Sequence, residues 1–208
     1  MSDGAWTLIS RYSNADSANW MQYNASWWYD RTTSYGSVIS SSDNYDMISP
    51  AFWLVQGDYL KITRNDDSSH TYLLYTSGGC TGGMTFRNFV TSFGNYRNGG
   101  IWNSDACRHY CHASFGGSYS STGGFSAAMC GSNLGIYGNN HLAFWCDWSS
   151  GDGAVMMIGG GGDGCYRADH GIGITEANQA RFGTGDCDGD FGDNCNFPNG
   201  YSLNLWIK

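Results

Sequence analysis

Glutamate, lysine and proline are nearly absent from this sequence of 208 residues, which contains one Glu, two Lys and two Pro. Charged residues of all kinds make up only 13% of the chain. A helical bundle needs Ala, Leu, Glu and Lys in quantity, because these residues form stable and soluble helix surfaces. The composition therefore excludes a mainly helical protein.

Positive charge is also scarce, since 10 Lys and Arg residues stand against 18 Asp and Glu residues, for a net charge of −8. Binding to nucleic acid or to an anionic membrane depends on a concentrated basic surface, and the cations here are scattered along the chain. The longest apolar runs, such as residues 154–158, are far too short to span a bilayer. We therefore expect a soluble protein with neither nucleic acid nor a membrane as a partner.

What the sequence has instead is glycine, aromatic residues and short runs with strand-like patterns. There are 31 glycines, and aromatic residues make up 16% of the chain, a proportion that a disordered chain would lack. Two short helices are predicted at residues 16–21 and 85–93, and residues 159–200 are predicted to be loop. With no linker and no repeat, residues 1–208 are predicted to form a single domain. Strands are predicted at residues 6–12, 59–64, 71–76, 143–146, 154–158 and 201–207.

The chain contains eight cysteines, and an even number in a Gly-rich, Lys-poor chain is typical of a secreted protein with disulfides. The sequence does not select among the pairings, apart from Cys187–Cys195, which would close a small ring around three aspartates. The group Cys107, Cys111 and His112 has separations that also occur in zinc sites. An oxidising compartment disfavours this alternative, because the thiols would form disulfides instead.

Residues 147–194 combine carboxylates with glycine more densely than the rest of the chain. They include eight aspartates, the only glutamate and a run of four glycines. Ca²⁺ takes about six to eight oxygen ligands in irregular geometry, and glycine lets backbone carbonyls turn toward an ion. The spacing of Asp186, Asp188 and Asp190 suits such a loop, although Phe191 and Phe197 replace the Gly and Glu of an EF-hand. The segment predicts a calcium site, with a solvated, disulfide-tied acidic loop as the alternative.

Several stretches of the chain resemble a known family. Residues 4–16 resemble the opening of fibrinogen-like domains. Residues 46–53, 151–162, 168–178 and 201–207 are similar to cnidarian fibrinogen-like proteins, including proteins of coral skeletal matrix. From the glycine run to the Asp-rich loop the chain also resembles the intelectins, which are calcium-dependent lectins. The resemblance implies an α+β fold: a fibrinogen-like domain with a twisted central sheet, few short helices and long Gly/Asp-rich calcium-bearing loops.

The resemblance also implies roles for individual residues. In intelectins a bound Ca²⁺ grips two vicinal hydroxyls of a sugar, and a glutamate after the glycine run contacts both the ion and the sugar. Glu176 stands at the matching position here, Asp190 corresponds to a second ligand, and Asp152 falls where intelectins have an asparagine ligand. An acidic residue and a histidine that precede the intelectin glycine run are replaced here by Ala154 and Val155, so the sugar preference does not transfer. The predicted metal ligands are Asp152, Asp169, Glu176, Asp188 and Asp190.

Three further side chains complete the predicted carbohydrate site beside Glu176. His170 lies next to Asp169 and could orient a sugar hydroxyl, because a neutral histidine both donates and accepts hydrogen bonds. Its alternative role is purely structural, with its nitrogens satisfied by backbone groups. Trp148 and Tyr166 flank the acidic segment and could pack against a sugar ring, or belong to the core as most of the nine tryptophans must.

Motifs for catalysis are missing from the sequence, which has no Gly-x-Ser-x-Gly, no His-Glu-x-x-His and no phosphate-binding loop. We therefore expect no enzymatic activity. The prediction is a secreted, calcium-dependent lectin that binds glycans and works as a homo-oligomer, because single sugar sites are weak. The alternative is an extracellular structural or mineral-associated matrix protein whose Ca²⁺ is purely architectural.

Overall fold

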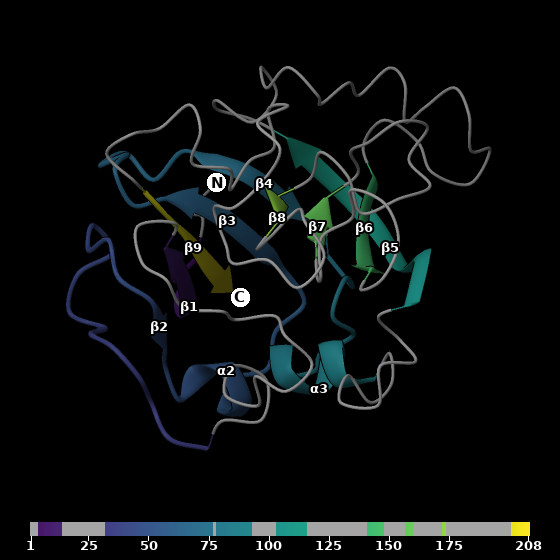
Figure 1. Cartoon of the computed structure of the whole chain (residues 1–208), viewed down its shortest axis with the longest axis horizontal. Coiled ribbons are helices and arrows are strands. Elements are labelled where there is room, and N and C mark those ends of the chain that lie inside the picture. The colour runs from purple at the N-terminus through teal and green to yellow at the C-terminus, as the bar shows by residue number, and fades with distance from the viewer. Residues whose placement is uncertain are drawn as a thin grey trace.

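The computed structural model describes residues 4–13, 32–76, 78–92, 103–115, 141–147, 157–159, 172–173 and 201–208. Between residues 103 and 173 the description is essentially of the backbone. These segments form an antiparallel sheet accompanied by two short helices, an architecture of the α+β kind (Figure 1).

One sheet joins all the described strands, in the order β2-β1-β9-β3-β4-β5-β6-β7-β8, and every neighbouring pair is antiparallel. The last strand of the chain, β9, lies between β1 and β3, so the two ends of the sequence pair in one half of the sheet. The strands are β1 (Thr7–Ser13), β2 (Met47–Ile48), β3 (Leu60–Arg64), β4 (Tyr72–Thr76), β5 (Asn103–Phe115), β6 (His141–Asp147), β7 (Met157–Gly159), β8 (Ile172–Gly173) and β9 (Ser202–Ile207).

Alternation along β1, β9, β3 and β4 gives this half of the sheet two different faces, because successive strand residues point to opposite sides. The register aligns Ile62 of β3 with Leu205 and with Leu74, and these side chains are buried. One face is mainly aliphatic and buried; its apolar members are Tyr12, Leu60, Ile62, Leu74, Leu203, Leu205 and Ile207. The opposite face consists of polar and aromatic residues: Arg11, Ser13, Lys61, Thr63, Tyr72, Tyr75, Ser202, Asn204 and Trp206.

The two helices, α2 (Ala51–Leu54) and α3 (Phe86–Thr91), lie together beside the sheet (Figure 1). Thr85 begins α3, and its hydroxyl accepts a hydrogen bond from the Asn88 N–H at 3.2 Å, a favourable N-cap. The rings of Phe52 and Phe86 meet edge to face with centroids 5.4 Å apart. Each helix is too short to be stable alone, so this aromatic packing holds them in place.

Most of the predicted elements that fall on described residues are confirmed. Strands occur at β1, β3, β4, β6 and β9, and α3 occupies the predicted second helix. The predicted strand at residues 154–158 is described only from Met157, where β7 begins. The first predicted helix, residues 16–21, lies outside the described residues.

Two of the sequence-based expectations were wrong or incomplete. Residues 159–200 are not all loop, because Gly159 belongs to β7 and Ile172–Gly173 form β8. The longest strand, β5, was not predicted, because Asn103–Phe115 contains no Val, Ile or Thr to indicate a strand. Its conformation follows from pairing with β4 on one side and β6 on the other.

No helix within the described residues is long and apolar enough to cross a membrane.

Candidate functional site

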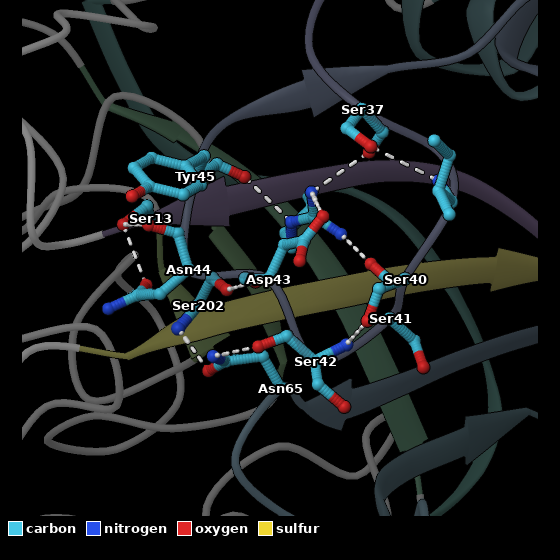
Figure 2. Close-up of polar contacts among 12 residues, drawn as sticks. Ser13, Ser37, Ser40, Ser41, Ser42, Asp43, Asn44, Tyr45, Asn65 and Ser202 are labelled. Atoms are coloured by element: carbon cyan, nitrogen blue, oxygen red, sulfur yellow. Dashed lines mark hydrogen bonds and ion pairs between the residues drawn. The ribbon is translucent and has the colours of Figure 1, made fainter.

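The part of the polar face formed by β1, β9 and the end of β3 is buried rather than exposed to water. Regular alternation usually places such a face in solvent, yet the side chains of Arg11, Ser202 and Asn204 have no exposed surface. The reason is that residues 37–45, which we call the 37–45 loop, lie across this face (Figure 2). The loop is the most densely hydrogen-bonded polar group among the described residues.

Arg11 holds the loop at three points through backbone carbonyls. Its Nε donates to the Tyr45 oxygen at 2.6 Å, Nη1 to the Ser40 oxygen at 2.7 Å and Nη2 to the Ser37 oxygen at 3.0 Å. The three accepting residues, Ser37, Ser40 and Tyr45, are labelled in Figure 2. A rigid planar fork of donors suits this arrangement, which a lysine could not reproduce.

Neutral side chains of the sheet complete the contact. Asn204 donates to the Ser41 oxygen at 2.8 Å, Asn65 to the Ser42 oxygen at 3.2 Å, and the Ser202 hydroxyl to the Asp43 oxygen at 3.0 Å. Asn44 is held through its side chain, which accepts from the Ser13 hydroxyl at 2.8 Å. The loop therefore lies with its carbonyl oxygens toward the sheet, and most of its attachment to the sheet is through its backbone.

The charges around the loop are balanced internally. The Asp43 carboxylate lies 3.8 Å from Nη2 of Arg11, and the buried Asp46 accepts from the Ser13 N–H at 2.7 Å. Burial lowers the pKa of Arg11, while the carboxylates of Asp43 and Asp46 oppose this shift. With all three guanidinium nitrogens donating to the chain's own oxygens, this group serves as an internal cation that fixes a loop. Sequence reasoning treated Arg11 only as part of an opening strand.

The exposed end of the same sheet face brings both lysines of the chain together. The ammonium of Lys61 lies 4.6 Å from the ring centroid of Trp6 and 5.4 Å from that of Trp206. The ammonium of Lys208 lies 5.8 Å from Trp6 and 5.7 Å from Tyr59. Cations over aromatic faces are attracted by the ring quadrupole. This group stabilises the junction of β3, β9 and the N-terminal segment.

All of the side chains predicted to form the calcium and carbohydrate site lie outside the described residues. This applies to the metal ligands and to the sugar-binding residues alike, so their mutual arrangement stays a prediction. They are Trp148, Asp152, Tyr166, Asp169, His170, Glu176, Asp188 and Asp190.

The described strands nevertheless define where the chain leaves the sheet near several of these residues. Trp145 of β6, Met157 of β7 and Gly173 of β8 are direct neighbours across the strands, and β6 and β8 run in the same direction. Trp148 and Glu176 each follow this row by three residues. Adjacent strands lie about 4.8 Å apart, so Trp145 and Gly173, which are two strands apart, are separated by about 10 Å. From these two points the chain continues in the same direction toward Trp148 and Glu176.

The segment with Asp169 and His170 enters β8 from its other end. His170 precedes Ile172 by two residues. Since β8 has only two residues, about 7 Å of strand separates its two ends. Asp188 and Asp190 lie in the connection from β8 to β9, far along the chain from any described residue.

The cysteines give one direct result. Cys80 is disulfide-bonded, as predicted for a chain with disulfides. The zinc alternative is disfavoured by the backbone, because Cys107 and Cys111 lie on the extended strand β5, about 13 Å apart. The proposed Cys187–Cys195 pair lies outside the described residues. Among the side chains that the structure describes, no group of three or more His, Cys, Asp or Glu is arranged to hold a metal.

Comparison of the chain with models of known protein families gives no match. Comparison with curated proteins gives no match either. The assignment of a function therefore depends on the chain's own residues and on the backbone that carries them.

Proposed function

We propose that this protein is a secreted, calcium-dependent lectin of fibrinogen-like fold, with its Ca²⁺ held by residues 147–194. Asp152, Asp169, Glu176 and Asp190 are the proposed ligands, with Asp188 as a further carboxylate, and backbone carbonyls complete the coordination. Two positions on the ion remain for vicinal hydroxyls of a sugar. His170 and Glu176 accept hydrogen bonds from these hydroxyls, and Trp148 or Tyr166 packs against the apolar side of the ring.

The observation that supports this proposal most is the concentration of acidic residues in one stretch of the chain. Residues 147–194 contain nine acidic residues against two arginines. In addition, β6 and β8 run in the same direction, and Trp145 and Gly173, which lie level with each other across Met157, precede Trp148 and Glu176 by three residues each. Carboxylates brought together on a glycine-rich backbone repel one another unless a cation intervenes, and Ca²⁺ is the cation that tolerates irregular oxygen ligands.

The test is a glycan array probed with the purified protein in Ca²⁺ and again in EDTA. We expect binding to a class of glycans with accessible vicinal hydroxyls, present with calcium and absent with the chelator. Glu176→Gln should abolish this binding while Cys80 and the sheet keep the fold intact. Asp67→Asn is the matched control, because it removes a carboxylate of the β3–β4 turn that is not among the proposed ligands and whose oxygens already accept backbone hydrogen bonds.

The outcomes separate the lectin from its rival. Glycan binding that persists in EDTA, or in Glu176→Gln, contradicts the proposed site. A calcium-dependent rise in melting temperature without glycan binding would instead indicate a matrix protein with an architectural ion.

A further inference from the structure

Exposed apolar side chains are concentrated in one stretch of the described chain. Of the six large hydrophobic side chains that are exposed there, four belong to the 37–45 loop or to its N-terminal approach: Tyr35, Val38, Ile39 and Tyr45. Ile39 is 93% exposed, Tyr45 72% and Val38 54%. Single exposed hydrophobic residues are ordinary, but a cluster of them on one loop indicates an interaction surface.

The fold does not require these side chains. The loop is attached to the sheet through carbonyl oxygens on either side of the Val38–Ile39 pair, since Arg11 donates to both Ser37 and Ser40. A loop held by its backbone could carry serine at these positions at little cost in stability. Valine and isoleucine at these positions instead expose apolar surface to water, which is unfavourable for the isolated chain.

The attachment also makes the loop a prepared surface. Arg11 holds the two ends of the exposed tip, and Gly36, with a φ of +71°, fixes its entry where a side chain would collide with the Asp46 carbonyl. A segment that is already ordered loses little conformational entropy on binding. Residues 35–45 contain four serines, two tyrosines, one Asn and one Gly, residue types that antibody loops also use for contact.

Charge decides which partner fits. The chain carries a net charge of −8, so two copies repel each other over most of their surfaces. Residues 32–45 contain a single charged side chain, Asp43, which lies 3.8 Å from the Arg11 guanidinium. Two copies that meet at this loop therefore place no uncompensated like charges opposite each other.

We infer that the 37–45 loop is a self-association surface, on which Val38, Ile39 and Tyr45 of one copy pack against the same loop of a second copy. A two-fold interface of this kind uses each residue twice. The inference does not depend on the calcium site. Where the proposed lectin holds, the same contact supplies the second sugar site that avidity requires.

Sedimentation velocity of the full chain over a range of concentrations, in Ca²⁺ and in EDTA, tests this inference. We expect reversible association in both conditions, weakened about tenfold or more by Ile39→Ser, because burial of an isoleucine is lost in each copy. Ile39→Asp should weaken it further by placing two like charges together. Leu54→Ser is the matched control, since Leu54 is 68% exposed on α2, and it should leave association unchanged.

Three results would overturn the assignment. The wild-type chain could remain a monomer at every concentration, the association could survive Ile39→Asp, or Leu54→Ser could weaken it equally. The lectin proposal is tested separately with a monovalent glycan. If Ile39→Asp removes only self-association, this glycan should bind the variant and the wild-type chain with equal affinity, whereas absence of binding to both would contradict the lectin proposal alone.

Discussion

The 37–45 loop and residues 147–194 are two polar parts of one chain, and they differ in how their oxygen atoms are neutralised. In the loop, seven backbone carbonyls accept hydrogen bonds from side chains in or next to the sheet, three of them from the single cation Arg11. In residues 147–194 the oxygen atoms belong to nine carboxylates, against only two arginines in the same segment. The 37–45 loop is therefore held by a cation of the chain itself, whereas residues 147–194 contain far fewer cations than carboxylates.

This difference has a physical consequence for how each region becomes ordered. A guanidinium that is covalently part of β1 is always present, so the loop forms together with the sheet. A carboxylate cluster needs a mobile cation, and its order depends on the concentration of that cation. We therefore expect the two regions to respond to different perturbations, and each prediction below tests that separation.

The largest effect is expected from Arg11→Met. Removing the guanidinium leaves the carbonyls of Ser37, Ser40 and Tyr45 without their donor and the Asp43 carboxylate without its partner, on a face that is otherwise buried. Breaking a buried charged network in this way typically costs about 3–5 kcal/mol of unfolding free energy. Denaturant unfolding followed by tryptophan fluorescence measures the loss.

Arg64→Met is the control for this substitution. Arg64 pairs with Asp66, half of whose side chain is exposed, and the Arg64 guanidinium carbon lies 4.4 Å from the ring centroid of Tyr201, so its removal should cost only about 1–2 kcal/mol. Equal losses in the two variants would show that burial of Arg11 does not matter, and would remove the basis for treating it as an internal cation.

The second largest effect concerns calcium itself. If residues 147–194 hold Ca²⁺, an ion concentration about 100-fold above the dissociation constant stabilises the fold by about 2.7 kcal/mol. This increment should be the same in the wild-type chain and in Arg11→Met, because the loop does not depend on the ion. Calorimetry of both proteins in Ca²⁺ and in EDTA provides the comparison, and an increment that disappears with Arg11 would mean that the two regions form one cooperative unit.

A smaller effect is expected at the lysine–aromatic group, where the ammonium groups of Lys61 and Lys208 lie near aromatic rings of the same chain. Trp6→Leu removes the ring that lies beneath both Lys61 and Lys208, together with the edge contact to Tyr75 at 5.7 Å. The expected cost is about 1–2 kcal/mol, of which each cation–π pair contributes about 0.5–1 kcal/mol. A double-mutant cycle with Lys61→Met isolates the Lys61–Trp6 pair. A coupling energy of zero would show that Trp6 contributes by packing alone and not by a cation–π interaction with Lys61.

The same contrast explains what the sequence could predict. Alternation in β9 identified Leu203, Leu205 and Ile207 as one face, since burial of aliphatic side chains is a local pattern. It could not predict that Ser202 and Asn204 are buried too, because their partners are carbonyls of a loop some 160 positions earlier in the chain. Every residue type has a backbone carbonyl, so the sequence does not indicate which carbonyls Arg11 binds, and its role could not be predicted. Carboxylates belong to Asp and Glu alone and can be read from the sequence. For that reason the acidic segment could be proposed as a site, although its side chains lie outside the described residues.

The smallest predicted effect is the response to acid at the β3–β4 turn, where a carboxylate is stabilised by hydrogen bonds from the chain itself. Asp67 accepts backbone hydrogen bonds from Ser69 at 2.9 Å and Thr71 at 2.8 Å. Hydrogen bonding from Thr71 and Ser69 lowers the pKa of Asp67 below its ordinary value of 3.8, with a minor contribution from His70. A carboxylate with a depressed pKa in the folded state adds stability above pH 3.8, and that stability is lost as the pH falls through the folded pKa. Unfolding in denaturant at a series of acidic pH values should show this loss in the wild-type chain and a reduced loss in Asp67→Asn. The turn is open to solvent, so the difference should be small and should not change when EDTA replaces Ca²⁺; a dependence on calcium there would place an ion on the turn and end the division between the two regions.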